Sequence, residues 1–358
     1  MRRSKIIGTG SYIPTKRIKN DFFRKSTFFV NYGNPILPND SPRIVDKFME
    51  ITGISERRWV NDDLVASDIG YLASEQALQS ANIDRESLDY IVFAHNFGDI
   101  SSNSRRSDFV PCLAARVKQR LGIVNSECIA YDLAFGCAGW VQSLIQADYY
   151  LRSGDASSAL LIGAETLSRV SDPHDRDSMI YSDGAGAAII QAQEVKDTVG
   201  IISHSTRSDA FDNEKLLWMG PSYDRNYPVN QLFLKMNGRK ILEYARTNVP
   251  LVVKKSLDRA GIALGDVTKI FLHQGNAKMA EAILKGICEL YEVPDIGADI
   301  MPMAVSWLGN NSVATVPTVL DLVLKGNITG HRLNPGDTVV LAAVGAGMNI
   351  CSLVYRWD

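Results

Sequence analysis

An internal repeat constrains the fold of this 358-residue chain more than any other feature of its sequence. Segment 81–93 reads as a helix end, a short turn and a buried apolar strand, and segment 260–272 has the same pattern, offset by 179 residues. A second pair supports the repeat, because glycine-rich turns precede apolar strands in both 184–190 and 345–353. The sequence therefore predicts two related α/β halves that divide near residue 195 and pack in layers around one core. Chance similarity of buried strands is the alternative explanation.

Residues 22–46 do not follow this pattern of helix, turn and strand. They are rich in turn-forming dipeptides, such as Asn34-Pro35 and Ser41-Pro42, which do not suit an element of the core. We expect this segment to be an inserted surface loop or lid.

Composition excludes several classes of protein. The chain is 46% hydrophobic and 22% charged, with a net charge of -2 and a pI near 6.2, so it lacks the basic surplus that nucleic-acid binding requires. Gly8, Gly10 and Pro14 interrupt the amino-terminal apolar run, so we expect a cytoplasmic protein without membrane insertion. The five cysteines form no C-x-x-C pair, so neither a disulfide framework nor a zinc site is predicted.

Cys137 is the first candidate for chemistry. It stands between small residues in 134–140, after an apolar strand and before a helical pattern over 141–151. A thiol at a helix amino terminus is expected to have a lowered pKa, and flanking glycines let a substrate approach the backbone. A lone cysteine among small residues is also a common feature of packed cores, so this motif alone does not establish a nucleophile.

Two further polar residues follow apolar segments in the second half. His273 ends the strand of 271–276, at the edge of the sheet where α/β proteins usually present functional groups. Asn310 follows a glycine in 307–315 and precedes a predicted helix. A structural histidine and an asparagine that caps a helix are the alternative interpretations of these two residues.

Taken together, the three motifs resemble the Cys-His-Asn set of the β-ketoacyl-acyl carrier protein synthase III family of thiolase-fold condensing enzymes. That family has a nucleophile elbow similar to A-C-A-G-F, an H-Q-A-N motif and a G-N-T-S-A-A motif. The corresponding segments here are Gly136-Cys137-Ala138-Gly139-Trp140, His273-Gln274-Gly275-Asn276 and Gly309-Asn310-Asn311-Ser312-Val313-Ala314. Other short motifs that resemble those of the family occur along nearly the whole chain, and only the segment 22–46 lies clearly outside the resemblance.

The resemblance implies a thiolase-like α/β fold in five α-β-α-β-α layers, with halves 1–195 and 196–358. It implies that Cys137 accepts an acyl group from a thioester, while the backbone N–H groups of Cys137 and Ala346 stabilise the oxyanion. A malonyl-type thioester then loses carbon dioxide, His273 and Asn310 stabilise the enolate, and a β-ketoacyl product forms. No cofactor is implied beyond coenzyme A or phosphopantetheine thioesters as substrates, and a homodimer is expected.

Several peripheral assignments also come from the resemblance. A tryptophan and an arginine that often sandwich the adenine of coenzyme A correspond to Lys47 and Arg176, so the donor could be bound to acyl carrier protein instead. Gln274 and Lys278 are expected to contact acyl carrier protein. Val110 takes the place of an aromatic residue that limits the acyl pocket, which suggests room for a longer chain.

Three alternatives remain at this stage. A papain-like protease also orders Cys, His and Asn along its chain with a similar spacing, but the C-G-[SA]-C-[WY] context is missing. A non-catalytic partner subunit of a heteromeric synthase is the second alternative. The third is a specialised ketosynthase that joins two β-ketoacyl chains into cyclohexanedione or dialkylresorcinol precursors.

Overall fold

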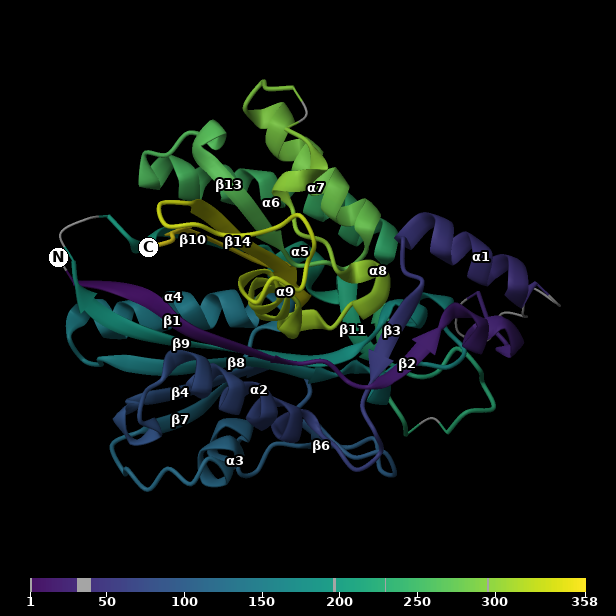
Figure 1. Cartoon of the computed structure of the whole chain (residues 1–358). Coiled ribbons are helices and arrows are strands. Elements are labelled where there is room, and N and C mark those ends of the chain that lie inside the picture. The colour runs from purple at the N-terminus through teal and green to yellow at the C-terminus, as the bar shows by residue number, and fades with distance from the viewer. Residues whose placement is uncertain (1, 31–39, 196–197, 229, 295) are drawn as a thin grey trace.

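The computed structural model describes residues 2–30, 40–195, 198–228, 230–294 and 296–358. Two large sheets organise this part of the chain, and helices lie outside them and between them (Figure 1).

The first sheet is built from the amino-terminal part of the chain. Its order is β1 (Arg2–Tyr12), β9 (Asp183–Glu194), β8 (Ser158–Thr166), β4 (Tyr90–His95) and β7 (Ile129–Ala134). The strands β8, β4 and β7 run parallel, whereas β9 pairs antiparallel with both β1 and β8. The parallel strands all end at one edge of the sheet, so the residues that follow β4 and β7 lie near each other.

The second sheet is built from the carboxyl-terminal part. Its order is β10 (Gly200–Ser208), β15 (Asn349–Arg356), β14 (Thr338–Gly345) and β13 (Val267–Leu272). Only β13 and β14 are parallel in this sheet.

Helices form the other three layers, as Figure 1 shows. The outer face of the first sheet carries α2 (Ala66–Ala81) and α3 (Leu113–Arg120), and that of the second carries α6 (Gly238–Ala260) and α7 (Ala277–Leu290). Between the sheets lie α4 (Gly139–Ser153) and α9 (Thr315–Leu324). The predicted α-β-α-β-α arrangement is confirmed. Helix α9 is apolar around most of its circumference because it is packed from both sides.

The first repeat corresponds to one structural unit in each half. Helix α2 leads to β4 and helix α6 leads to β13, each through a short 3-10 turn. Both helices end on a residue in the left-handed conformation, Asn82 with φ 51° and Gly261 with φ 66°. The boundary predicted near residue 195 lies between β9 and β10, and the division of the chain into two domains stays a prediction.

The second repeat was predicted less well. The turn of Gly345 to Gly347 does separate β14 from β15, but Gly184 and Gly186 lie inside strand β9. A Cβ atom at Gly186 would meet Pro317 at 2.7 Å, because α9 packs directly on this strand. Close helix packing therefore explains the glycine here, and no turn is present.

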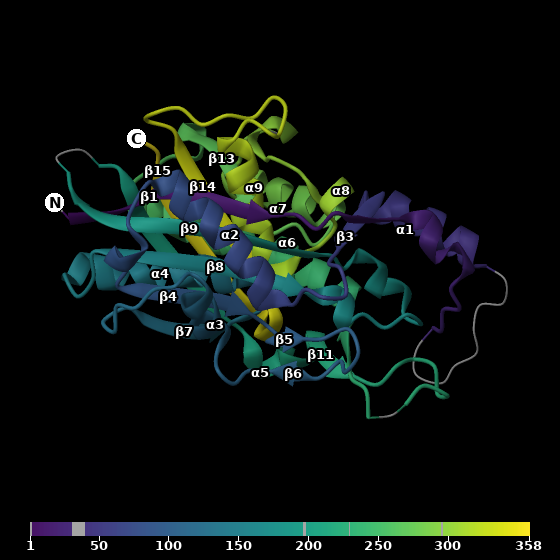
Figure 2. The same cartoon turned by 60° about the horizontal axis from the view of Figure 1, so that its bottom comes forward.

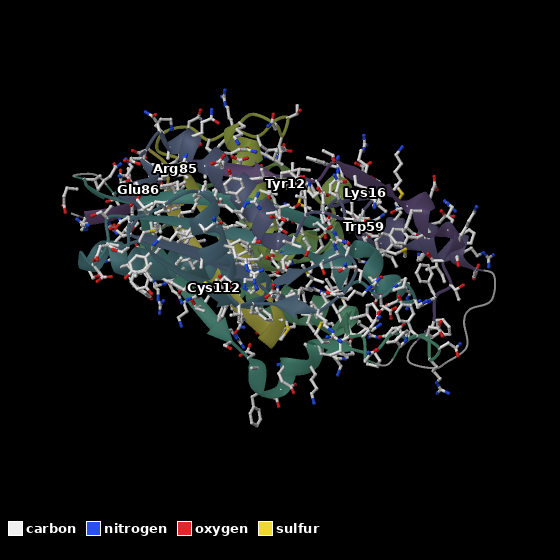
Figure 3. All side chains as sticks on the ribbon, turned by 90° about the horizontal axis from the view of Figure 1, so that it is seen from below. Tyr12, Lys16, Trp59, Arg85, Glu86 and Cys112 are labelled. Carbon is white, nitrogen blue, oxygen red and sulfur yellow. The ribbon has the colours of Figure 1, made fainter. Side chains whose placement is uncertain are left out.

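A smaller unit extends from one end of the layers. It contains the strand pair β2 (Lys16–Lys19) and β3 (Glu56–Trp59) and the helix α1 (Ser41–Thr52), at the right of Figures 1 and 2. Lys16 and Trp59 are partners in this pair and lie side by side in Figure 3.

The expectation of a surface loop at 22–46 is only partly correct. Phe23, Phe28 and Val45 are buried in one apolar cluster with the body of the protein, so parts of this segment anchor it. Residues 31–39 lie outside the described part of the chain.

The remaining elements are short. They are β5 (Asp99–Ile100), β6 (Ser107–Asp108), α5 (Ala210–Asn213), α8 (Val305–Leu308), and the hairpin of β11 (Leu217–Gly220) and β12 (Phe233–Met236). Among the helices of the described residues, none has the length and apolar character needed to span a membrane.

Candidate active site

Cys137 lies in the sharp turn that connects β7 to α4. The turn needs Gly136, which has φ +62° and whose Cβ position lies 2.6 Å from the backbone nitrogen of Ala346. A Cβ atom at Gly345 would likewise overlap the backbone nitrogen of Cys137. The glycine turn of the second half therefore packs directly against the nucleophile elbow of the first, and the predicted strand-to-helix elbow is present.

The thiol of Cys137 does not have the lowered pKa that its place before a helix suggested. Burial raises the pKa of Cys137 to about 11, although a hydrogen bond from Ser312 opposes this rise. Desolvation of the thiolate in this enclosed turn outweighs the favourable end of the helix. The expectation was wrong in sign, and the thiol is neutral at pH 7.

His273 follows β13 and is 5% exposed. Burial lowers the pKa of His273 to about 4, so the imidazole is neutral at pH 7. Its Nδ1 atom is buried and has no hydrogen-bond partner among the described residues. A neutral imidazole in this place is suited to interact with a developing oxyanion by hydrogen bonding.

Asn310 is held by its backbone. Its N–H donates to the carbonyl of Ile180 at 2.9 Å, and its carbonyl accepts from the N–H of Ser182 at 2.9 Å. Its side-chain Oδ1 accepts from the N–H of Ser312 at 2.9 Å. This hydrogen bond fixes the orientation of the side-chain amide, so that Nδ2 remains available as a donor. Both ends of the residue are thereby fixed.

These residues meet in one cavity. Cys137, His273, Asn310 and Ala346 all line one cavity of about 260 Å³, so the structure brings the predicted set together from both halves. Another part of the cavity wall is apolar. The hairpin of β11 and β12 contributes Leu217, Trp218, Met219, Leu234 and Met236 to it. This wall is suited to the hydrocarbon parts of a substrate.

Sequence reasoning missed three residues that support the nucleophile. The Ser312 hydroxyl donates to Cys137 Sγ at 3.1 Å, and Asn96 Nδ2 donates to Ser312 Oγ at 3.0 Å. Glu165 accepts from the backbone N–H of Asn96 at 2.5 Å. The position of Asn96, directly after the buried strand β4, was a signal that could have been used, because His273 was found by the same criterion.

Gln274 and Val110, to which the resemblance gives roles in carrier binding and in the acyl pocket, do not line this cavity. Gln274 is 1% exposed, donates to the carbonyl of Pro302 and accepts from Ala304 and Val305, so the prediction that it contacts a carrier protein is wrong. Val110 is 85% exposed and does not line the cavity, so its assignment to an acyl pocket stays a prediction.

The two basic residues lie at the surface. Lys278 is exposed in the first turn of α7, and Arg176 lines a separate groove of about 400 Å³ together with Lys47 and Arg43. Their assigned roles stay predictions. Across the described ranges, no group of three or more His, Cys, Asp and Glu residues is arranged to hold a metal ion.

Comparison with known proteins agrees with this geometry. The family model of 3-oxoacyl-[acyl-carrier-protein] synthase III matches residues 131–210, and the model of its C-terminal part matches residues 257–357. The β-ketoacyl-[acyl-carrier-protein] synthase III of Pectobacterium atrosepticum is 32% identical over 355 residues, which cover 99% of both chains. The chain belongs to the β-ketoacyl-acyl carrier protein synthase III family.

Other members of the family give the same result. The synthase III of Xanthomonas campestris is 33% identical over 362 residues, covering 99% of this chain and 98% of its own. The crystal structure of the Pseudomonas aeruginosa synthase III superposes with a TM-score of 0.79 at 26% identity, covering 99% of this chain and 98% of the other. Membership of this family excludes the papain-like protease interpretation.

Proposed function

We propose that the chain is an acyltransferase that condenses an acyl thioester with a malonyl-type carrier thioester to give a β-ketoacyl product. The observation that carries this proposal is the cavity shared by Cys137, His273 and Asn310, with a neutral imidazole and a fixed amide beside a thiol. Family membership supports the same reaction.

In the first half-reaction, the sulfur of Cys137 forms a bond to the acyl carbonyl carbon and the bond from that carbon to the donor sulfur breaks. The thiol proton leaves with the released donor thiol. The backbone N–H groups of Cys137 and Ala346 lie close to each other across the contact of Gly136 and Gly345, so both can donate to the oxyanion.

In the second half-reaction, the bond between the malonyl carboxylate and the α-carbon breaks and releases carbon dioxide. The electron pair moves to the thioester oxygen, where His273 and Asn310 offer neutral donors. The α-carbon then attacks the acyl carbonyl, a C–C bond forms, the bond from the carbonyl carbon to Cys137 breaks, and the released thiolate takes up one proton from solvent. All three residues are present, which argues against a non-catalytic partner subunit.

A homodimer is part of this proposal. Strand β7 is the edge of the first sheet and pairs only with β4 in the described chain. Its first residue, Ile129, is 50% exposed, and exposed Phe109 and Val110 precede α3, which packs against β7. A second copy that pairs along β7 would cover this edge, which otherwise offers unpaired backbone groups to other chains.

The proposed protein partner is acyl carrier protein, which would contact exposed basic residues such as Lys278. The donor proposed for the first step is also bound to carrier protein, because Lys47 stands where an adenine-stacking tryptophan is expected.

A panel of acyl thioesters of coenzyme A and of carrier protein tests the proposal. Mass spectrometry should detect an acyl group on the Cys137 peptide, and malonyl-carrier protein should then give a β-ketoacyl product of the corresponding mass. Failure of every donor to label Cys137 would refute the proposal.

A further inference from the structure

A chain of hydrogen bonds connects a buried carboxyl group to the nucleophile. Glu165, near the end of β8, is 2% exposed and accepts from the Asn96 backbone N–H through Oε1. The Asn96 side chain donates to Ser312 Oγ, and Ser312 donates its single hydroxyl hydrogen to Cys137 Sγ. Because Asn96 occupies Ser312 as an acceptor, the hydroxyl hydrogen is left for the sulfur.

The other oxygen of this carboxyl group is a second, independent observation. Glu165 Oε2 is buried and has no hydrogen-bond partner among the described residues, although nearly all buried polar atoms of proteins have one. A carboxyl group with one free oxygen is poorly stabilised when ionised. It is therefore a group that can change charge inside the protein.

The groups that face Glu165 determine when this change occurs. The pKa of Glu165 is raised to about 7, because burial and, to a smaller extent, the charge of Asp183 raise it more than Asn96 and His95 lower it. Asp183 itself accepts hydrogen bonds from Ser168 and Val60. A negative charge on Glu165 in turn raises the pKa of Cys137.

We propose that Glu165 is a positioning residue for Cys137 that orients Ser312 toward the sulfur through Asn96 and opposes thiolate formation when it is ionised. The inference rests on the proposed role of Cys137 as the nucleophile. The two effects have opposite signs: the acceptor oxygen favours the thiolate, and the charge disfavours it. A neutral Glu165 retains the first effect and loses the second.

The pH dependence of Cys137 alkylation by iodoacetamide, followed by peptide mass spectrometry, separates the two effects. In the wild type, the rate should rise less than tenfold per pH unit near about pH 7, because Glu165 ionises there. Glu165→Gln keeps an acceptor oxygen and removes the charge. Its rate should rise tenfold per unit and exceed that of the wild type about three- to tenfold at about pH 8.5.

Two further variants test the hydrogen bonds. Ser312→Ala should react about tenfold more slowly, because the thiolate loses its donor. Asn96→Ala keeps the backbone N–H to Glu165 and releases Ser312, so it should also react more slowly while the pH inflection remains. Asn96→Ala remains informative if Glu165→Gln does not fold.

Asp148→Asn is the matched control. Asp148 is a fully buried carboxyl group on α4, the helix that follows Cys137, and it makes no contact with Asn96 or Ser312. This variant should show the wild-type profile. A wild-type profile in Glu165→Gln, wild-type speed in Asn96→Ala, or the same shift in Asp148→Asn would each overturn the inference.

Acyl labelling of the same proteins distinguishes failure of the proposed function from failure of the role proposed for Glu165. A wild type that no thioester labels would refute the proposed function. A labelled wild type together with an unchanged Glu165→Gln profile would refute only the role of Glu165.

Discussion

Two groups of buried polar residues flank the cavity, and they differ in how completely they are hydrogen-bonded. Behind β12, the ammonium group of Lys235 lies 2.5 Å from Asp172 and 3.1 Å from Asp175, and its Nζ lies 3.5 Å from the centre of the Tyr223 ring. On the reactive side, His273 Nδ1, Glu165 Oε2 and the Tyr181 hydroxyl have no partner among the described residues.

The ion cluster of Lys235, Asp172 and Asp175 lies behind β12, one of the strands that line the cavity. Side chains alternate along β12, so Leu234 and Met236 line the cavity while Lys235 lies in the ion cluster behind the strand. Burial raises the pKa of Asp172, but hydrogen bonds from Lys235, His174 and Tyr223 outweigh it and leave the pKa below its ordinary value. Every charge in this cluster therefore has a partner.

The buried polar groups behind β12 are all hydrogen-bonded, whereas several of those near Cys137 are not. Satisfied buried groups stabilise one conformation, whereas unsatisfied groups cost stability and remain available to a substrate. We expect substitutions in the first group to affect stability and substitutions in the second to affect chemistry.

The largest expected effect is at the reactive side. Cys137→Ala should abolish acyl transfer to the protein, because no other residue in the cavity offers a thiol. His273→Ala and Asn310→Ala should leave labelling of Cys137 measurable and reduce condensation by about 10²-fold or more, because they act on the enolate. Acyl labelling that persists in Cys137→Ala would contradict the assignment of the nucleophile.

Substitution of Lys235 tests the opposite side of the comparison. Lys235→Met should lower the free energy of unfolding by about 3–5 kcal/mol, because it leaves Asp172 and Asp175 buried without a counter-charge. Urea unfolding measures this change. Lys240→Met, at an exposed site of α6, is the control and should change stability little. A loss below about 1 kcal/mol in Lys235→Met would show that the cluster does not stabilise the fold.

The buried imidazole of His273 should cost stability in acid. The pKa of His273 is about 4 when folded and about 6.5 when unfolded, so only the unfolded chain gains the proton between these values. Stability should therefore fall as the pH falls from about 6.5 to about 4, with a contribution from His273 of up to about 3 kcal/mol.

Unfolding of His273→Asn across this range measures that contribution, which the variant should lack. Cys137→Ala is the control, because the pKa of Cys137 is about 11 and the thiol does not titrate in this window. Identical slopes for His273→Asn and the wild type would contradict a buried neutral histidine.

The smallest expected effect is at the surface, outside both groups. Lys278→Glu should weaken the interaction with carrier protein about three- to tenfold at low salt and less at high salt, because the contact is electrostatic and exposed. Lys285→Glu, also exposed on α7, is the matched control. Equal carrier kinetics for Lys278→Glu and the wild type at low salt would exclude this contact.

The sequence predicted the features that depend on local pattern. The elbow before α4 and the end of β13 were found because a buried strand followed by a small or polar residue is visible in the chain itself. The layered fold followed from the repeat of helix, turn and strand.

The features that were missed depend on contacts between distant segments. Ser312 meets Cys137 across 175 residues of sequence and Asn96 across 216, and no local pattern reports such distances. The errors have the same origin. Gln274 belongs to a motif of the reactive site, yet the backbone of Pro302 to Val305 satisfies its amide and encloses it.

The close contact of Gly345 with the backbone of Cys137 has a consequence for dividing the protein. A chain cut between β9 and β10 would place the thiol on one polypeptide and the imidazole, the amide and the Ala346 N–H on the other. Neither fragment could carry out the condensation alone. Product formation after mixing would therefore report reassembly of the fragments, and the chain could serve as a split reporter for the association of proteins fused to its two parts.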